Sequence, residues 1–217
     1  MVEQRGLRER KKVTTRRLLA TVALDLFEER GFDNVQVAEI AAAAQVSKKT
    51  VFNYFEVKED LVLGSGKHHI TEPATVVRER PPGQTPHAAI REYLLTALAE
   101  RQPMTGLTDH PDIPRIQRLV RTTPALAVRQ MQYREQSRQL LATALVEEGA
   151  SALSAELMAT QILGAQQVVI AEIGRRVSAG EKPDDVYPDA VTVTRHAFRW
   201  LERGLGDTLR RPASSGD

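Results

Sequence analysis

The chain has 217 residues, of which 41% are hydrophobic and 27% charged, so it can bury a real core as one large domain or two small ones. Cysteine is absent, which excludes disulfides, thiolate metal sites and cysteine nucleophiles. No apolar run reaches the roughly 18–20 residues that span a membrane, and the first residues, MVEQRGLRERKK, lead into no apolar stretch typical of a signal peptide. We therefore expect a cytoplasmic protein without a membrane partner.

The net charge of +2 is unevenly distributed. The first twenty residues hold two acidic side chains, Glu3 and Glu9, against seven basic ones: Arg5, Arg8, Arg10, Lys11, Lys12, Arg16 and Arg17. The rest of the chain is therefore slightly acidic. This basic arm is either a solvated terminus or a segment that contacts a polyanion.

Apolar residues recur at Leu18, Val22 and Leu26, and in parallel at Leu19, Ala23 and Phe27, which is the spacing of one helical stripe. The pattern predicts a helix over about residues 8–30, which ends at Gly31 as a left-handed C-cap. Phe32 can then pack back on the stripe.

Two short helices are predicted next. Residues 37–44 carry small apolar residues at helical spacing, and Gln45 and Val46 interrupt them. Ser47 is a good N-cap for a second short helix that closes at Phe55. A further helix begins near Lys58.

Residues 73–86, PATVVRERPPGQTP, predict a loop because they contain four prolines and a glycine and show no helical period. It follows a long helix that contains His68 and His69. The remaining predicted helices cover residues 87–101, 113–121, 124–148, 154–178 and 184–209, the fourth with Ser154 as its N-cap, and residues 210–217 form a disordered tail. No strand-like alternation occurs, so the fold class is all-α.

The last two predicted helices indicate self-association. The first is apolar over most of its circumference, so it must be buried on more than one side. We expect a homodimer through this pair, with candidate interface residues Val169, Ile173, Val193, Ala197 and Leu201. A core buried entirely within one chain is the alternative.

The stretch VSKKTVFNYF, residues 46–55, has the outline of the second helix of a helix-turn-helix. In that motif the N-terminal residues of the second helix reach the bases of the major groove, and the positive end of the helix dipole suits phosphate. Lys48 and Lys49 add full charges there, while Val51 and Phe55 lie on the opposite side. An amphipathic core helix with exposed lysines is the bland alternative.

A longer pattern makes the resemblance specific. The segments are A-x-x-L-F-x-x-x-G-F from Ala23, I-A-x-x-A from Ile40, V-S-x-x-T from Val46, Y-F at residues 54–55 and K-E-x-L from Lys58. Over roughly residues 10–63 the chain resembles the N-terminal DNA-binding domain of the TetR family of bacterial transcriptional regulators.

The resemblance implies roles for single residues. Lys48, Lys49 and Thr50 match positions that reach bases and nearby phosphates, with Ser47 as the cap before them. Tyr54 and Lys58 match contacts to the DNA backbone, Phe52 matches a position close to the DNA, and Ala38 one that often carries a polar contact. Three positions depart from the family pattern: Gln36 and Val57 replace capping residues, and Gln45 replaces the turn glycine, where a left-handed backbone would be strained.

For the rest of the chain the resemblance implies a helical effector-binding and dimerisation domain. We expect a DNA-binding domain over residues 1–60 and this second domain over residues 61–209. A small, moderately hydrophobic effector would release the homodimer from a palindromic operator in double-stranded DNA. Candidate effector-binding residues are Leu94, Leu98, Met131 and Gln166.

Other constellations carry less chemistry. Adjacent His68 and His69 should point about 100° apart on a helix, so we expect no metal and no other cofactor. No nucleophile elbow, phosphate loop or paired-carboxylate motif appears, so we do not expect an enzyme. A DNA-binding protein without an effector, architectural or controlled by a protein partner, stays open as the second interpretation.

Overall fold

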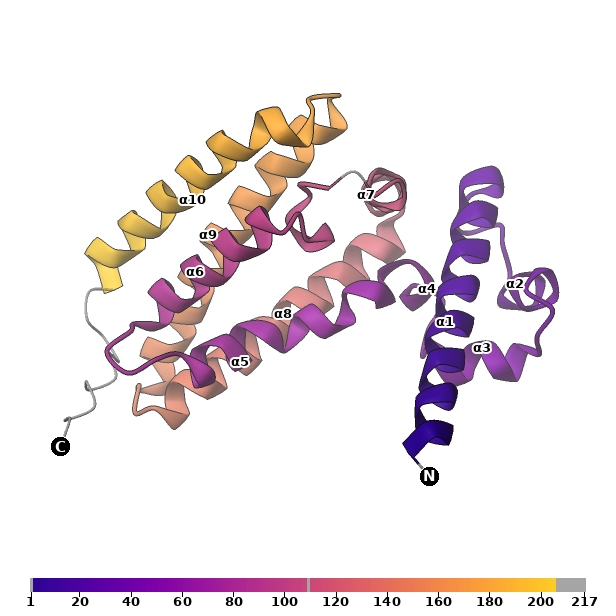
Figure 1. Ribbon diagram of the computed structural model, residues 1–217, viewed down its shortest axis with the longest axis horizontal. Helices are drawn as coiled ribbons and strands as arrows, with labels where there is room; N and C mark the ends of the chain where they lie inside the picture. Colours follow the sequence, from indigo (N-terminus) through magenta and orange to yellow (C-terminus); the bar gives the residue numbers. More distant parts are fainter. Residues whose placement is uncertain (1, 109, 206–217) are drawn as a thin grey trace. The chain divides into compact units, whose positions relative to one another are not determined.

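The computed structural model describes residues 2–108 and 110–205. Its elements are α1 (Val2–Arg30), α2 (Val37–Ala43), α3 (Lys48–Tyr54), α4 (Asp60–Leu63), the 3-10 helix η1 (Gly64–Ile70), α5 (Glu72–Glu79), α6 (Pro86–Ala99), the 3-10 helix η2 (Pro103–Thr105), α7 (Asp112–Thr122), α8 (Pro124–Glu147), α9 (Ala152–Ser178) and α10 (Pro183–Leu205) (Figure 1). These ranges contain no strand, which confirms the all-α class. None of their helices is long and apolar enough to cross a membrane. The predicted tail and the end of the last predicted helix lie outside the described residues.

The chain divides into two compact units, and the first comprises residues 1–67 and 114–131. Its core holds Leu19, Ala23 and Phe27 of α1 together with buried residues of α2 and α3. Gly31 ends α1 with φ +81°, and the Phe32 ring lies 4.8 Å from that of Phe27. The predicted C-cap and the return of Phe32 onto the stripe are confirmed.

The second segment of unit 1 is held to the first by ion pairs. Arg115 of α7 donates to the carboxylates of Asp25 and Glu28 on α1, at 2.6 Å each. Arg129 of α8 donates to Asp60 of α4 at 3.0 Å. The expected boundary at residue 60 thus lies inside unit 1. These pairs join residues far apart in the sequence, so no local sequence pattern predicts them.

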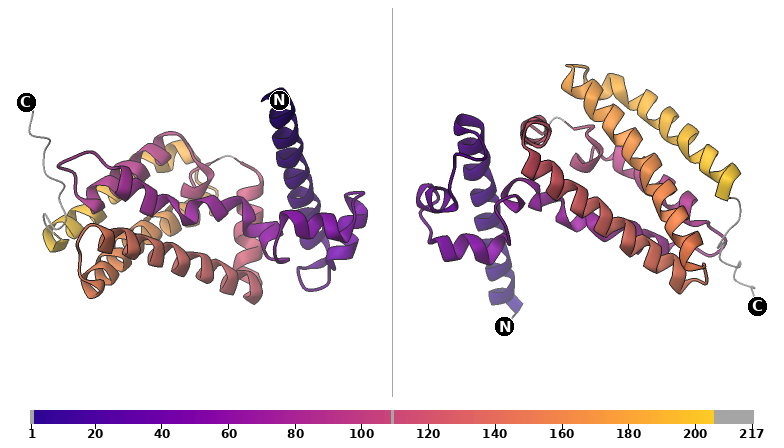
Figure 2. Two further views of the ribbon diagram at one scale, coloured as in Figure 1. Left: turned by 90° about the horizontal axis from the view of Figure 1, so that it is seen from below. Right: turned by 180° about the vertical axis from the view of Figure 1, so that it is seen from behind.

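The second unit comprises residues 68–113 and 132–217. Its core gathers buried side chains of α5, α6, α8, α9 and α10: Val77, Ile90, Leu94, Leu98, Leu141, Leu145, Met158, Ile162 and Phe198 among them. The views in Figures 1 and 2 show α9 and α10 as long neighbouring helices, and α10 also packs against α6.

Three local predictions were wrong. The predicted loop over 73–86 contains α5, because Pro73 stands in the first helical turn, where its missing N–H is harmless. The predicted long helix around His68 is divided into α4, η1 and α5. The cap of α9 is Ser151, whose hydroxyl accepts from the Ser154 N–H at 3.2 Å, so Ser154 lies inside the first turn.

Candidate DNA-binding surface

Helix α2 begins without a Ser or Thr cap, but a side chain of its first turn binds the backbone N–H of Gln36. The Gln36 N–H donates to the Glu39 carboxylate at 2.7 Å, and Arg30 pairs with the same carboxylate at 2.8 Å. The hydrogen bond from the Gln36 backbone and the one from Arg30 together lower the pKa of Glu39 below its usual value. Glu39 therefore supplies half of a capping box in place of the expected cap.

The turn between α2 and α3 is closed by backbone hydrogen bonds. The N–H of Gln45 donates to Ala42 at 3.0 Å, and that of Val46 donates to Ala41 at 2.9 Å. Gln45 has φ +56°, so the left-handed conformation suspected there is confirmed. A residue with a Cβ is strained by about 1–2 kcal/mol in this conformation.

Gln45→Gly is expected to stabilise unit 1 by about 1 kcal/mol, because glycine relieves the left-handed strain while losing some backbone entropy on folding. The measurement is urea unfolding followed by circular dichroism. Gln45→Ala is the matched control, since it removes the amide and keeps the Cβ. Equal stabilities of the two variants would show that the turn stores no strain.

Helix α3 faces two ways, as predicted. The Ser47 hydroxyl accepts from the Thr50 N–H at 3.0 Å and caps the helix. Val51 and Phe55 are buried, which confirms that they anchor α3 to the core. Lys48, Lys49 and Phe52 are exposed on the other side.

Phe52 is 45% exposed, so it does not serve the core. The Lys48 ammonium lies 6.0 Å from the centre of its ring, at the edge of cation–π range. Together with Lys49 these side chains form a cationic and apolar tip. Ala38 is exposed on α2, and Tyr54 is half-buried at the end of α3.

Arg16 positions this tip, and sequence analysis missed that role. Its guanidinium donates to the carbonyl oxygens of Tyr54, at 2.9 Å, and Gly64, at 3.0 Å, and it lies 4.7 Å from the centre of the Phe55 ring. It thus joins α1 to the end of α3 and the start of η1. Arg16 stands among the basic residues of the arm, and nothing in its spacing separates it from its neighbours.

Gly64 gives Arg16 the room for this contact. A Cβ on Gly64 would lie 2.9 Å from a guanidinium nitrogen of Arg16 and 3.4 Å from the Phe55 ring. A side chain at position 64 would therefore push the guanidinium away from the carbonyl oxygens that it binds.

We expect Arg16→Ala to destabilise unit 1 by about 2–3 kcal/mol, since two charge-assisted hydrogen bonds and a cation–π contact disappear. Lys12→Ala is the matched control, because its exposed side chain lies one helical turn earlier on α1. Chemical denaturation of both variants measures the difference. An Arg16→Ala protein as stable as Lys12→Ala would refute the positioning role.

Lys58 is engaged by the protein itself. Its ammonium donates to the Phe32 carbonyl at 2.5 Å and lies 4.3 Å from the Phe32 ring centre and 5.4 Å from that of Phe27. Partial burial lowers its pKa, against the opposing charges of nearby carboxylates. Val57, directly before Lys58, has no polar side chain that could cap a helix, and α4 begins only at Asp60.

The four candidate effector residues differ in burial and in the unit to which they belong. Leu94 and Leu98 of α6 are fully buried in the core of unit 2, and Gln166 of α9 is nearly so. Met131 belongs to unit 1 and is 64% exposed.

The candidate interface residues also differ in their exposure to solvent. Val169 and Ile173 are enclosed within unit 2, whereas Val193 is 43% exposed and Ala197 and Leu201 are partly exposed. Sequence analysis missed the most exposed apolar side chains of α9 and α10: Leu153, Leu157, Val168 and Trp200. Helical periodicity could have found some of them, because Leu153 and Leu157 are four residues apart and Trp200 follows the predicted Ala197 by three.

The geometry defines a helical protein with a helix-turn-helix in its first unit. Residues 19–64 match the family model described as bacterial regulatory proteins, tetR family. Over these residues the chain is similar to the TetR family.

Two curated relatives illustrate the match. The chain is 34% identical over 85 residues to the HTH-type transcriptional regulator TcmR of Streptomyces glaucescens, covering 39% of this chain and 38% of TcmR. It is 52% identical over 44 residues to the HTH-type transcriptional regulator LuxR of Vibrio harveyi, covering 20% of this chain and 22% of LuxR. The chain therefore spans well under half the length of these relatives.

Solved structures share the fold over more of the chain. GusR of Salmonella enterica has a TM-score of 0.53 at 15% identity, with 88% of this chain and 94% of GusR covered. The SmeT–triclosan complex has a TM-score of 0.50 at 14% identity, with 94% and 98% covered.

Proposed function

We propose that the chain is a homodimeric transcriptional regulator that binds a palindromic operator and is released by a small, moderately hydrophobic effector. The observation that carries the DNA-binding part is the Ser47-capped α3. Its first turn presents Lys48 and Lys49 to solvent, while Val51 and Phe55 hold its other side in the core. A capped, anchored and positively charged helix N-terminus is what a major groove accepts.

The test is selection of bound DNA from a random pool with the purified full-length chain. We expect a palindromic consensus whose half-sites are one helical turn apart, about 34 Å. Failure to enrich any sequence would overturn the proposal and favour the architectural alternative.

Two lysines should separate base reading from phosphate binding. Lys48→Ala is expected to change which bases are preferred, whereas Lys58→Ala weakens binding to every sequence and lowers the salt slope by about 1, because one phosphate is no longer neutralised. Since Lys58 also bonds to Phe32, thermal unfolding of that variant must accompany the DNA titration. Lys182→Ala, an exposed lysine of unit 2, is the control. Parallel losses on operator and random DNA for both variants would refute this assignment.

Homodimerisation is supported by an exposed apolar face on α9 and α10. We define this face by Leu157, Val168, Val193 and Trp200, which are 43–69% exposed. Exposed apolar residues at coiled-coil-like intervals favour a helical partner, and a second copy of the chain supplies one.

The effector proposal rests on the apolar lining of unit 2. Leu94 and Leu98 are packed with Met158 and Ile162, so a ligand at this place has to displace core contacts. It can shift the protein between two states only if it binds one of them more tightly. SmeT, which shares this fold, is described in complex with triclosan, a precedent for a small ligand in that protein.

The second candidate is a DNA-binding protein that answers to no small molecule. The close packing around Leu94 and Leu98 favours it. Screening for compounds that release the selected operator from the wild-type chain separates the two, because only the effector-controlled protein loses operator binding.

A further inference from the structure

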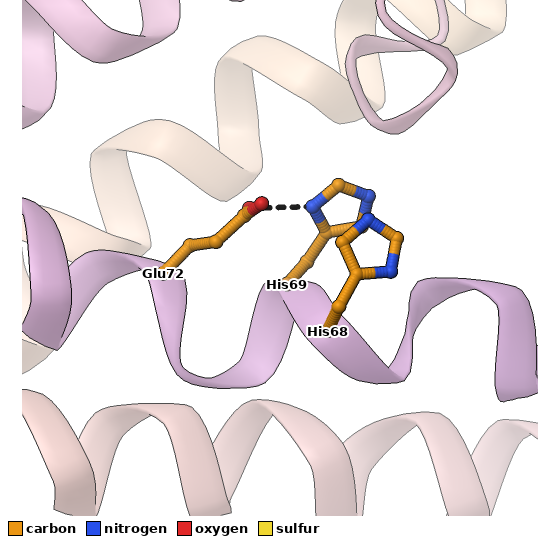
Figure 3. Close-up of side chains that lie close together, drawn as sticks. All are labelled: His68, His69 and Glu72. Atoms are coloured by element: carbon orange, nitrogen blue, oxygen red, sulfur yellow. Dashed lines mark hydrogen bonds and ion pairs between the residues drawn. The ribbon is translucent and has the colours of Figure 1, made fainter. Parts of the chain in front are cut away.

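His68, His69 and Glu72 converge where η1 meets α5 (Figure 3). One potential ligand atom from each residue, an imidazole nitrogen or a carboxylate oxygen, lies within 4.8 Å of the other two. The ring centres of His68 and His69 are 3.8 Å apart, so the divergence expected for adjacent histidines does not occur here. Two rotatable bonds in each side chain are enough to bring the rings together.

Glu72 is oriented by groups from two other elements. The Nδ1 atom of His69 lies 2.5 Å from Glu72 Oε2, and the Tyr93 hydroxyl of α6 donates to the same oxygen at 2.5 Å. Carboxylate ligands of metal ions are commonly held by such outer hydrogen bonds. The cluster thus has three candidate ligands and one residue, Tyr93, that positions them.

We propose that His68, His69 and Glu72 bind one divalent transition-metal ion of the Zn²⁺ class. Two imidazoles and one carboxylate suit zinc, cobalt or nickel, whereas Mg²⁺ and Ca²⁺ prefer oxygen ligands alone. This site is separate from the DNA-binding and effector functions proposed above, and its test does not depend on them.

The geometry can accommodate the ion with small side-chain movements. In a tetrahedral zinc site with bonds of about 2.0–2.1 Å, ligand atoms are roughly 3.3 Å apart. The His69–Glu72 hydrogen bond has to open, and the wider separations have to close by about 1.5 Å at most. His68 is exposed and the other two residues are half-buried, so the ion enters from solvent and water completes its coordination.

The competing explanation is a charge-assisted hydrogen bond between His69 and Glu72 that needs no ion. In that case His68 has no role, because its side chain belongs to neither hydrogen bond of Glu72. Replacing His68 therefore discriminates between the two explanations.

The experiment uses the full-length chain without a histidine tag, stripped of metal by a chelator. Zn²⁺ is titrated in competition with a chromophoric indicator, and Co²⁺ is added separately to record its visible absorption. We expect one Zn²⁺ per chain, cobalt bands of a four- or five-coordinate site, and a rise in the unfolding temperature with Zn²⁺. Mg²⁺ at the same concentration should do none of this.

His68→Ala and Glu72→Gln are each expected to weaken zinc binding at least about tenfold, and Tyr93→Phe by roughly 10-fold, as for other outer hydrogen-bond partners. His110→Ala, an exposed histidine outside the cluster, is the matched control and should bind like the wild type. Equal zinc affinity of the wild type and a His68→Ala/His69→Ala double variant would overturn the proposal. So would a wild type whose unfolding temperature Zn²⁺ leaves unchanged.

Discussion

Asp60→Ala is expected to destabilise unit 1 by about 3 kcal/mol, because it breaks a buried ion pair and removes the carboxylate that faces the Arg129 guanidinium. The Asp60 side chain is 2% exposed, and Arg129 donates to its two oxygens at 3.0 and 3.3 Å. The Lys67 ammonium lies 3.7 Å from one of these oxygens. Removing the carboxylate leaves two cations beside each other, with the exposed Glu56 as the remaining carboxylate that pairs with both.

The measurement is urea unfolding of Asp60→Ala and of a double-mutant cycle made of Asp60→Leu, Arg129→Met and the double variant. Asp60→Leu/Arg129→Met should recover most of the lost stability, since an apolar pair of similar volume often replaces a buried ion pair without cost. A double variant as unstable as Asp60→Ala would show that packing, not the unpaired charge, sets the loss.

Asp60 and Arg129 join two distant segments of unit 1. Asp60 belongs to α4 and Arg129 to the first part of α8, a helix that begins in unit 1 and continues in unit 2. Arg115 ties α7 to α1 in the same unit.

How much of the fold and of the DNA-binding surface can be predicted from the sequence depends on how far apart in the chain the contacting residues lie. The cap at Ser47, the anchors Val51 and Phe55 and the end of α1 at Gly31 follow from local patterns, and the structure has them all. Arg16 was not separable from the basic arm, because its partners Tyr54 and Gly64 are 38 and 48 residues away.

The misplaced elements have other causes. Four prolines and a glycine within residues 73–86 favour a loop and hide α5, although Pro73 stands in the first helical turn, which tolerates proline. In α9 the apolar pattern runs around the helix, so periodicity alone does not say which side the chain uses for its own core. Val169 and Ile173 are on that inner side, and Val168 is on the outer side.

The outer side of α9 and α10 leads to the prediction with the largest effect on DNA binding. A Val168→Glu/Trp200→Glu variant is expected to raise the dimer dissociation constant by at least about 1,000-fold, because each lost hot-spot side chain costs roughly 2 kcal/mol or more and recurs in both protomers. Val168 is 69% and Trp200 64% exposed, so the charges are solvated in the monomer and the fold should persist.

Sedimentation velocity and titration of the selected operator measure this outcome. The variant should sediment as a folded monomer and lose most of its operator affinity, because a single protomer fills only one half-site. Val146→Glu is the matched control, since Val146 is 45% exposed on α8 and lies outside the apolar face. A variant that stays dimeric would show that the dimer interface lies elsewhere. A monomeric variant that still binds the operator would show that operator binding does not require a dimer.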